Sequence, residues 1–202
     1  MKIDIKRMLY ALIGICLVGI GVAFNNSSRL GNDPIGIVYD GVRSALSLSA
    51  AQLGTASNFV NYGIIIMLVF IGRKYLNIGT LIYILPYGFF VNMGSKLYTI
   101  LFLGDGLAVR ILSVVIGCLV LYIGVAIYIA VDIGLDPFTG LVMVISDKVK
   151  KEYGITKIVF DIFMILLGVI LGGRLGVITI ITALSAGPSI QFFSKIIKKY
   201  IK

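Results

Sequence analysis

Long apolar segments, separated by short polar or glycine-rich turns, make up most of this chain. Two of them, residues 8–24 and 111–131, approach or exceed the roughly 20 residues that an α-helix needs to cross a bilayer. Hydrophobic residues reach 59% of the total and charged residues only 13%, which is unlike an ordinary soluble domain. The pattern predicts an all-α polytopic membrane protein, with residues 1–202 forming a single membrane domain.

One short stretch occurs twice. Gly31-Asn32-Asp33-Pro34 returns as Gly134-Leu135-Asp136-Pro137, and three blocks of residues match between the halves in the same order. The matched pairs include Gly14 with Gly117, Asn61 with Asp161, and Thr80 with Thr179. Such ordered self-similarity predicts duplication and fusion of one unit. Internal repeat 1 covers about residues 7–102 and internal repeat 2 about 109–198.

Each unit is expected to contain four helices in the same order. The first is long and apolar, the second is short, and the third and fourth are again long. Their expected ranges are 7–28 and 109–131, 34–48 and 137–150, 56–72 and 156–172, and 78–102 and 175–197. Pro86 and Pro188 are expected to interrupt the last helix of each unit, because proline removes a helical hydrogen bond.

The two short helices decide the predicted topology. Each begins with Asp-Pro, where Asp can cap free backbone N–H groups and Pro suits the first helical position. In the second copy only about 11 apolar positions precede Asp147, which corresponds to ~16 Å and suits a re-entrant or cavity-lining helix. Each unit then has three spans, giving six spans in an inverted repeat. If both short helices cross the membrane, the alternative is eight spans in parallel repeats.

The basic residues lie mostly at the ends of apolar segments. The net charge is +9, which in a soluble protein would suggest nucleic acid, but orientation and lipid headgroups explain this placement better. With the N-terminus inside, 13 of the 18 Lys and Arg residues are cytoplasmic, although eight spans give nearly the same tally. The remaining five lie outside or within the membrane: Arg29, Arg43, Lys96, Arg110 and Arg174.

No catalytic or metal-binding pattern occurs in the sequence. The absence of histidine excludes His-based metal sites, Ser-His-Asp chemistry and histidine proton relays. Nothing resembles a nucleophile with its base, a phosphate-binding loop or a spaced metal-ligand set. Cys16 and Cys118 are interpreted as small packing residues. We therefore expect neither an enzyme nor a cofactor.

The two Asp-Pro helix starts are the first candidates for a substrate-binding site. They contain Asn32 and Asp33 in one copy, and Asp136 and Thr139 in the other. Facing half-helix N-termini can hold an anionic group, because they carry free N–H donors and a positive dipole end. The negative charge of Asp itself favours a cation or amine instead. Simple capping, which contributes about 1 kcal/mol per helix, is the structural alternative.

Polar residues inside predicted spans are the second candidates. Asn61 and Asp161 occupy matching positions, and an ionisable residue inside a span commonly marks a pathway or proton relay. An ion pair between Lys157 and Asp161, four residues apart, is the alternative. Asn92 and Gln191 match in the last helices, where they can line the same cavity or form interhelical hydrogen bonds.

The polar face of the first short helix carries Asp40 and Arg43, three residues apart. This spacing predicts an ion pair that lines a cavity or faces water, in preference to direct substrate binding.

The doubled Gly-x-Asp-Pro, the glycine turns at Gly54 and Gly154, and the spans with Asn61 and Asp161 together resemble the YitT/YczE type of bacterial integral membrane proteins. The resemblance covers essentially the whole chain. It implies a multi-pass protein of the bacterial cytoplasmic (inner) membrane, and transport is often assumed for that family. It supplies no substrate and no site residues.

These observations predict a small-molecule membrane transporter or channel-like permease, with both termini cytoplasmic and Asp161 as the candidate proton carrier. The alternative is a non-transporting scaffold or accessory subunit of an enzyme or larger transport complex, which would dock through residues 148–153 and the basic tail. The expected partners are the lipid bilayer, a small-molecule solute and either another copy of this chain or a second protein. Nucleic acid is not expected.

Overall fold

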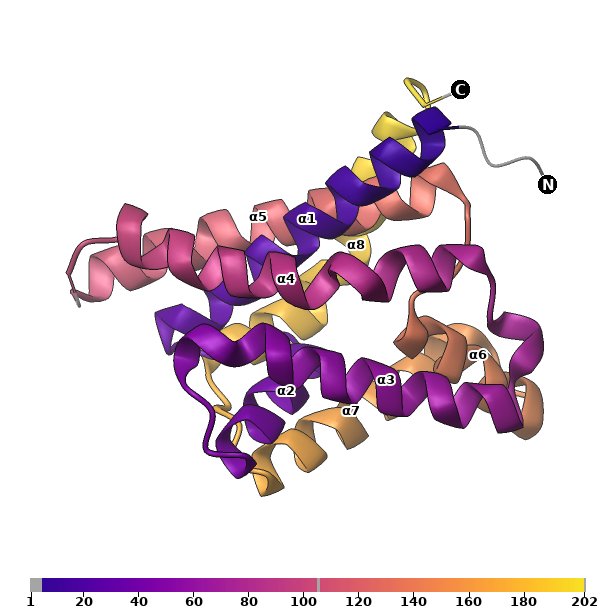
Figure 1. The fold of residues 1–202 in the computed structure, drawn as a ribbon, viewed down its shortest axis with the longest axis horizontal. Coiled ribbons are helices and arrows are strands. Elements are labelled where there is room, and N and C mark those ends of the chain that lie inside the picture. The colour runs from indigo at the N-terminus through magenta and orange to yellow at the C-terminus, as the bar shows by residue number, and fades with distance from the viewer. Residues whose placement is uncertain (1–4, 105, 202) are drawn as a thin grey trace.

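The computed structural model describes residues 5–104 and 106–201, and within these ranges it contains eight α-helices, two short 3₁₀ helices and no strand. The all-α expectation is therefore confirmed. The helices are α1 (Ile5–Ser28), α2 (Pro34–Ala45), α3 (Leu53–Ile71), α4 (Ile78–Leu101), α5 (Leu107–Val131), α6 (Pro137–Val149), α7 (Tyr153–Ile170) and α8 (Val177–Ile197) (Figure 1). The 3₁₀ helices are Ala50–Gln52 and Arg73–Tyr75.

Six of the helices in the described ranges are long and apolar enough to cross a membrane: α1, α3 with its preceding 3₁₀ turn, α4, α5, α7 and α8. The short helices α2 and α6 contain 12 and 13 residues, or roughly 18–20 Å, against a hydrocarbon core of about 30 Å. Large apolar side chains such as Phe70, Ile170 and Leu184 are exposed on α3, α7 and α8. Such a surface suggests a membrane protein whose outer helices face lipid.

Helices α1 and α5 cross closely at the centre of the bundle because glycines line their contact. A Cβ atom on Gly21 would lie 2.6 Å from the carbonyl oxygen of Gly117, and one on Gly14 would lie 2.9 Å from that of Gly124. The two contacts are equivalent in the repeat, because Gly21 corresponds to Gly124 and Gly117 corresponds to Gly14 at an offset of 103. Small residues let helix backbones approach to this distance, as in membrane helix pairs.

The backbone leaves its helices in the same way in both halves. Arg29 and Asp132 follow α1 and α5 with φ of 61° and 51°, and Ser47 and Lys150 follow α2 and α6 with φ of 54° and 53°. Each pair is 103 residues apart. Left-handed residues that are not glycine are uncommon, so their recurrence at one offset is informative.

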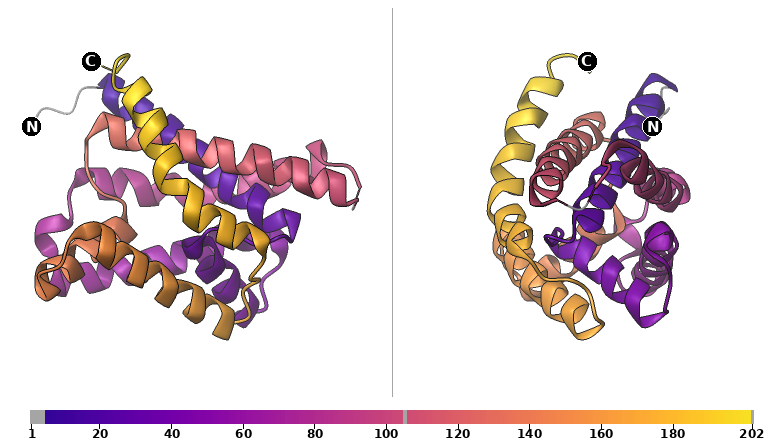
Figure 2. Two further views of the ribbon diagram at one scale, coloured as in Figure 1. Left: turned by 180° about the vertical axis from the view of Figure 1, so that it is seen from behind. Right: turned by 90° about the vertical axis from the view of Figure 1, so that its left-hand side faces the viewer.

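The short helices lie toward opposite ends of α3 and α7 (Figures 1 and 2). Helix α2 packs against α7, where Ile37 contacts Gly168, and α6 packs against α3, where Gly140 faces Leu68. The beginning of α1 and the end of α8 lie near each other at one end of the molecule. Each short helix therefore packs mainly against a long helix of the other half.

The expected interruptions of the last helices are wrong. Helices α4 and α8 continue through Pro86 and Pro188. A proline can remain inside a membrane helix when neighbouring helices and side chains compensate for the lost hydrogen bond. Close packing supports α4 beside its proline, since the Asn58 side chain lies directly against Gly88.

Candidate functional site

Both short helices begin with an aspartate cap followed by proline. Asp33 Oδ2 accepts hydrogen bonds from the backbone N–H groups of Ile35 and Gly36, each at 3.2 Å. Asp136 Oδ1 accepts from the backbone N–H of Thr139 at 3.0 Å, and its Oδ2 accepts from the Thr139 hydroxyl. The capping role expected from the sequence is thus present at both starts.

The two caps differ in their second oxygen. Asp33 Oδ1 is inaccessible to solvent and has no hydrogen-bond partner among the described residues. The cause is local, because Gly36 stands where the second copy has Thr139 and offers no hydroxyl. A Cβ atom at position 36 would overlap the side chain of Asn32, which is buried and accepts a hydrogen bond from Asp33 N at 2.9 Å. Asn32 therefore shapes the turn and keeps position 36 small.

Asn61, in the middle of α3 and only 1% exposed, also has a buried polar atom without a hydrogen-bond partner in the described ranges. Its Oδ1 accepts a hydrogen bond from the Tyr39 hydroxyl at 3.3 Å, whereas its Nδ2 has no partner within the described part of the chain. Two further buried atoms of the described residues, Asn25 Nδ2 and Asn58 Oδ1, also lack a partner. We call Asp33 Oδ1 and Asn61 Nδ2 the open polar atoms, because Asp33 caps α2 and Asn61 accepts a hydrogen bond from Tyr39 on that same short helix. The ring of Tyr39 also packs against Tyr87 and Phe138, with centroids 5.9 Å apart in both cases. Because Phe138 directly follows the first residue of α6, Tyr39 connects the two helix starts.

An ion pair between Lys157 and Asp161 on α7 adds charge to this region. This is the ion pair between residues four positions apart that was the predicted alternative to a proton-carrying role for Asp161. Both charges act on Asp33. Loss of solvent raises the pKa of the Asp33 carboxyl, and the negative charge of Asp161 raises it further. Hydrogen bonds from backbone N–H groups and the positive charge of Lys157 lower this pKa, but the net change is a rise. Asp33 therefore holds a proton more readily than an ordinary aspartate.

The remaining predicted site residues lie elsewhere. Asn92 Oδ1 accepts a hydrogen bond from Gly54 N at 2.7 Å, so this side chain joins α4 to α3. Gln191 is exposed on α8. Asp161 thus acts on Asp33 through its charge, and Asn61 is bonded to Tyr39 on the helix that Asp33 caps.

Asp40 and Arg43 form the expected ion pair, with Arg43 Nε 2.9 Å from Asp40 Oδ1. Asp40 is 2% exposed, and its Oδ2 accepts a hydrogen bond from the backbone N–H of Arg174 at 3.0 Å. Arg43 Nη1 also donates to the carbonyl of Leu48 at 2.8 Å. The pair therefore ties the far end of α2 to the turn between α7 and α8.

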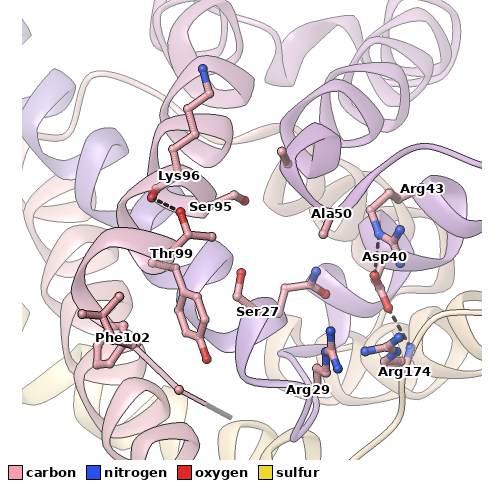
Figure 3. Close-up of a pocket in the computed structure, with 15 residues that line it drawn as sticks. Ser27, Arg29, Asp40, Arg43, Ala50, Ser95, Lys96, Thr99, Phe102 and Arg174 are labelled. Carbon is pink, nitrogen blue, oxygen red and sulfur yellow. Dashed lines mark hydrogen bonds and ion pairs between the residues drawn. The ribbon is translucent and has the colours of Figure 1, made fainter.

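This pair lies in the wall of a cavity of about 500 Å³ (Figure 3). The cavity is formed by the ends of α1, α2 and α4, the 3₁₀ turn at 50–52 and the α7–α8 turn. Among the described lining residues, Asp40 has the one carboxylate and four residues are cationic: Arg29, Arg43, Lys96 and Arg174. Sequence reasoning missed this cluster, although these are four of the five basic residues that the charge rule left outside the cytoplasm. The placement of these basic residues away from the cytoplasmic side was the feature of the sequence that could have indicated the cluster.

Metal binding has no candidate ligand cluster in the described ranges, where no group of three or more Cys, Asp or Glu residues lies together. Two features therefore remain as candidate sites. One is the pair of open polar atoms of Asp33 and Asn61, and the other is the basic cavity at the far end of α2.

Comparison with known proteins gives a family without an assigned activity. A family described as "Family of unknown function (DUF6198)" matches residues 5–195. An uncharacterized protein of Haemophilus influenzae is 28% identical over 195 residues, which cover 96% of this chain and 86% of that protein. The uncharacterized protein YyaS of Bacillus subtilis is 20% identical over 198 residues, covering 96% and 95%. No solved structure matches significantly. The chain belongs to the DUF6198 family.

Proposed function

We propose that this protein is a membrane transporter or channel-like permease for a small polar solute, built from two inverted units of three spans and one short helix. The recurrence of left-handed residues at an offset of 103 supports the duplication. The reciprocal packing of α2 on α7 and α6 on α3 supports inversion, because it places the short helices toward opposite ends of the bundle.

The proposed location is the bacterial cytoplasmic membrane, with both termini in the cytoplasm. Six spans bring the chain back to its starting side, and the start of α1 and end of α8 lie near each other. The charge distribution agrees with the positive-inside rule. The resemblance of the sequence to YitT/YczE-type bacterial membrane proteins is compatible with this location.

The observation that carries the transport function is the pair of open polar atoms. A buried polar atom without a partner typically costs about 1–3 kcal/mol, so such atoms require a reason beyond stability. Here they belong to Asp33, which caps the N-terminus of α2, and to Asn61, which accepts a hydrogen bond from Tyr39 on the same short helix. Transporters place solute and coupling-ion sites at such discontinuous helices.

Asp33, rather than Asp161, is the proposed proton carrier. Asp161 is already neutralised by Lys157, whereas Asp33 has a free oxygen and a pKa that is raised by the loss of solvent. Protonation of Asp33 changes the charge of the three groups together from one net negative to neutral. The solute crosses unchanged, so no catalytic chemistry is proposed.

A flux experiment tests this function directly. Purified protein is reconstituted into liposomes that contain a pH-sensitive dye, and a library of small metabolites is screened under an imposed pH gradient. For any solute that moves, the Asp33→Asn variant is expected to lose the dependence on the gradient. Asn caps helices about as well as Asp, so the fold should persist.

Asp136→Asn is the matched control, because it changes the equivalent cap whose oxygens are both bonded. It is expected to keep gradient-driven uptake. Wild-type uptake in the Asp33→Asn variant would refute the role of Asp33. Lack of flux for every solute, together with a co-purifying partner protein, would favour the scaffold or accessory subunit instead.

A further inference from the structure

The basic cavity at the far end of α2 has an excess of positive charge that its own carboxylate does not neutralise. Among the described residues that line the cavity, four are cationic and one is acidic, and both oxygens of that acid are bonded: Asp40 accepts from Arg43 Nε and from the backbone N–H of Arg174. Because the ammonium of Lys96 points away from the cavity, the three arginines leave a surplus of about two positive charges around its volume of about 500 Å³. That volume falls in the range of small-molecule sites.

Two of the cations have free guanidinium groups. The side chains of Arg29 and Arg174 are exposed, and neither makes a hydrogen bond or ion pair among the residues that the structure describes. Figure 3 shows them beside each other and close to the Asp40–Arg43 pair, whereas the ammonium of Lys96 points away. Three guanidinium groups therefore gather on one wall of the cavity.

The buried Asp40 holds this wall in place. Through Oδ1 it orients Arg43, and through Oδ2 it fixes the turn that carries Arg174. The Leu48 carbonyl fixes Arg43 from its other side. A buried carboxylate that positions two arginines without neutralising the group is an arrangement suited to an anion.

The opposite wall is aromatic. The ring of Tyr98 on α4 packs against that of Phe102, just after α4, with centroids 5.1 Å apart, and Phe102 also packs edge-on against Phe24 at 5.3 Å. The Ser27 side chain lies between the two walls, whereas the Thr99 hydroxyl donates to the carbonyl of Lys96 on its own helix. The cavity therefore combines a cationic wall with an apolar one.

We propose that this cavity binds the phosphate or carboxylate group of a small organic anion, with Arg29, Arg43 and Arg174 as its ligands and the aromatic wall against the organic part. Guanidinium forks match the paired oxygens of these groups geometrically. Either a free solute or an anionic lipid headgroup supplies the same chemistry. The experiment below separates the two sources.

The inference rests on the proposed transport function where it names the solute class. Asp40 follows Asp33 by seven residues on α2, or about 10 Å along the helix axis. An anion that moves from the cavity toward the helix starts meets the carboxylate of Asp33, and repulsion falls only when Asp33 is protonated. Anion and proton would then move together.

Binding of phenyl phosphate tests the site without requiring transport. Purified protein in a non-ionic detergent is titrated calorimetrically with phenyl phosphate, with benzylamine as the probe of opposite charge. The Arg29→Gln/Arg174→Gln double variant is expected to bind phenyl phosphate at least about tenfold more weakly than wild type. Lys199→Gln, an exposed cation at the end of α8, is the matched control and should bind like wild type.

A lipid arm identifies the source of the anion. Native mass spectrometry measures phosphatidylglycerol retained by each variant, and phosphatidylglycerol is tested as a competitor of phenyl phosphate. Phenyl phosphate binding that the double variant loses supports a solute site. If no protein binds phenyl phosphate, but wild type retains phosphatidylglycerol and the double variant does not, the site holds a lipid headgroup.

Three results would overturn the proposal. They are equal binding of phenyl phosphate by wild type and the double variant, tighter binding of benzylamine than of phenyl phosphate, and no binding of either phenyl phosphate or phosphatidylglycerol. Circular dichroism verifies that the double variant remains helical, and its two single variants give independent readings. If phenyl phosphate binds but no solute is transported, the anion site stands and the transport function fails. If a solute is transported and the double variant transports it and binds phenyl phosphate like wild type, the transport function stands and the anion site fails.

Discussion

Asp33 and Asp136 cap two short helices that begin with the same Asp-Pro pair, yet only Asp136 has both oxygens bonded. The Thr139 hydroxyl supplies the second bond, and Gly36 cannot. Duplication would preserve the helix start in both halves, because capping is needed in each. A single change three residues later leaves one carboxylate oxygen free in one half only. The comparison separates the capping role, which both aspartates have, from the proton-carrying role that we propose for Asp33 alone.

The far ends of the same helices repeat this contrast. Asp40 on α2 bonds Arg174 in the α7–α8 turn, and Asp147 on α6 pairs with Lys74 in the turn that precedes α4. Each short helix is thus tied by a carboxylate to a turn of the other half. The first tie is buried beside the basic cavity, and the second is exposed. The proposed anion site therefore lies at the first short helix and not at the second.

Placing threonine at position 36 should give the largest effect. The Gly36→Thr variant imitates the second helix start, but its Cβ would overlap the buried side chain of Asn32. Overpacking of this kind costs about 3 kcal/mol, so the variant should unfold at markedly lower temperature. Thermal unfolding followed by circular dichroism measures the change. Adding Asn32→Gly removes the obstacle and should recover part of the loss; no recovery would mean that another contact restricts position 36.

Asp40→Asn should come next. The substitution leaves Arg43, 16% exposed, without its carboxylate and weakens the tie to the α7–α8 turn. Partial exposure of the pair reduces the usual cost of breaking a buried ion pair, so we expect about 2 kcal/mol of destabilisation. Unfolding in increasing concentrations of a denaturing detergent measures it. A change below the error of that assay would show that Asp40 does not hold the turn.

Thr139→Val converts the second helix start into a chemical copy of the first. It keeps the shape of the side chain and the backbone N–H bond to Asp136 Oδ1, but removes the hydroxyl bond to Oδ2. Loss of one hydrogen bond should cost about 1 kcal/mol in thermal unfolding. Proton-driven uptake should stay at the wild-type rate. A change in uptake would mean that Asp136 takes part in coupling.

The sequence anticipated much of the fold because the signals were local. Apolar length identified the six long helices, and Asp-Pro identified the first residues of both short ones, Pro34 and Pro137. The same local reasoning failed at Pro86, because a proline's effect on a membrane helix depends on what packs around it.

The candidate site depended more on tertiary structure. Arg29 and Arg174 are 145 residues apart in sequence, and no pattern brings them to one cavity wall. The difference between Gly36 and Thr139 is visible in the sequence. Its consequence requires the position of the Asp33 carboxylate, which no periodicity supplies.

The pH dependence of stability should distinguish the two capping aspartates by a smaller effect. The pKa of Asp33 is raised above its ordinary value of 3.8, so the folded state binds this proton more tightly than the unfolded state. Its contribution is fully present below pH 3.8 and is lost as pH rises through the raised pKa. Thermal unfolding of Asp33→Asn should therefore vary less with pH across this window than that of wild type. An unchanged profile would mean that Asp33 is ionised throughout.

Asp147→Asn should have the smallest effect and completes the comparison of the far ends. Hydrogen bonds from Lys74 and then from Tyr75 lower the pKa of Asp147, so any stability it provides is present at neutral pH and lost only as pH falls through that lowered value. Both partners are exposed, with 69% of the Lys74 side chain and 44% of the Asp147 side chain accessible. Exposed pairs are weakened by water and salt, so the unfolding temperature at pH 7 should not change measurably. If Asp147→Asn destabilised the protein as much as Asp40→Asn, the two ties would be equivalent, and burial would not explain why the cavity lies at one short helix only.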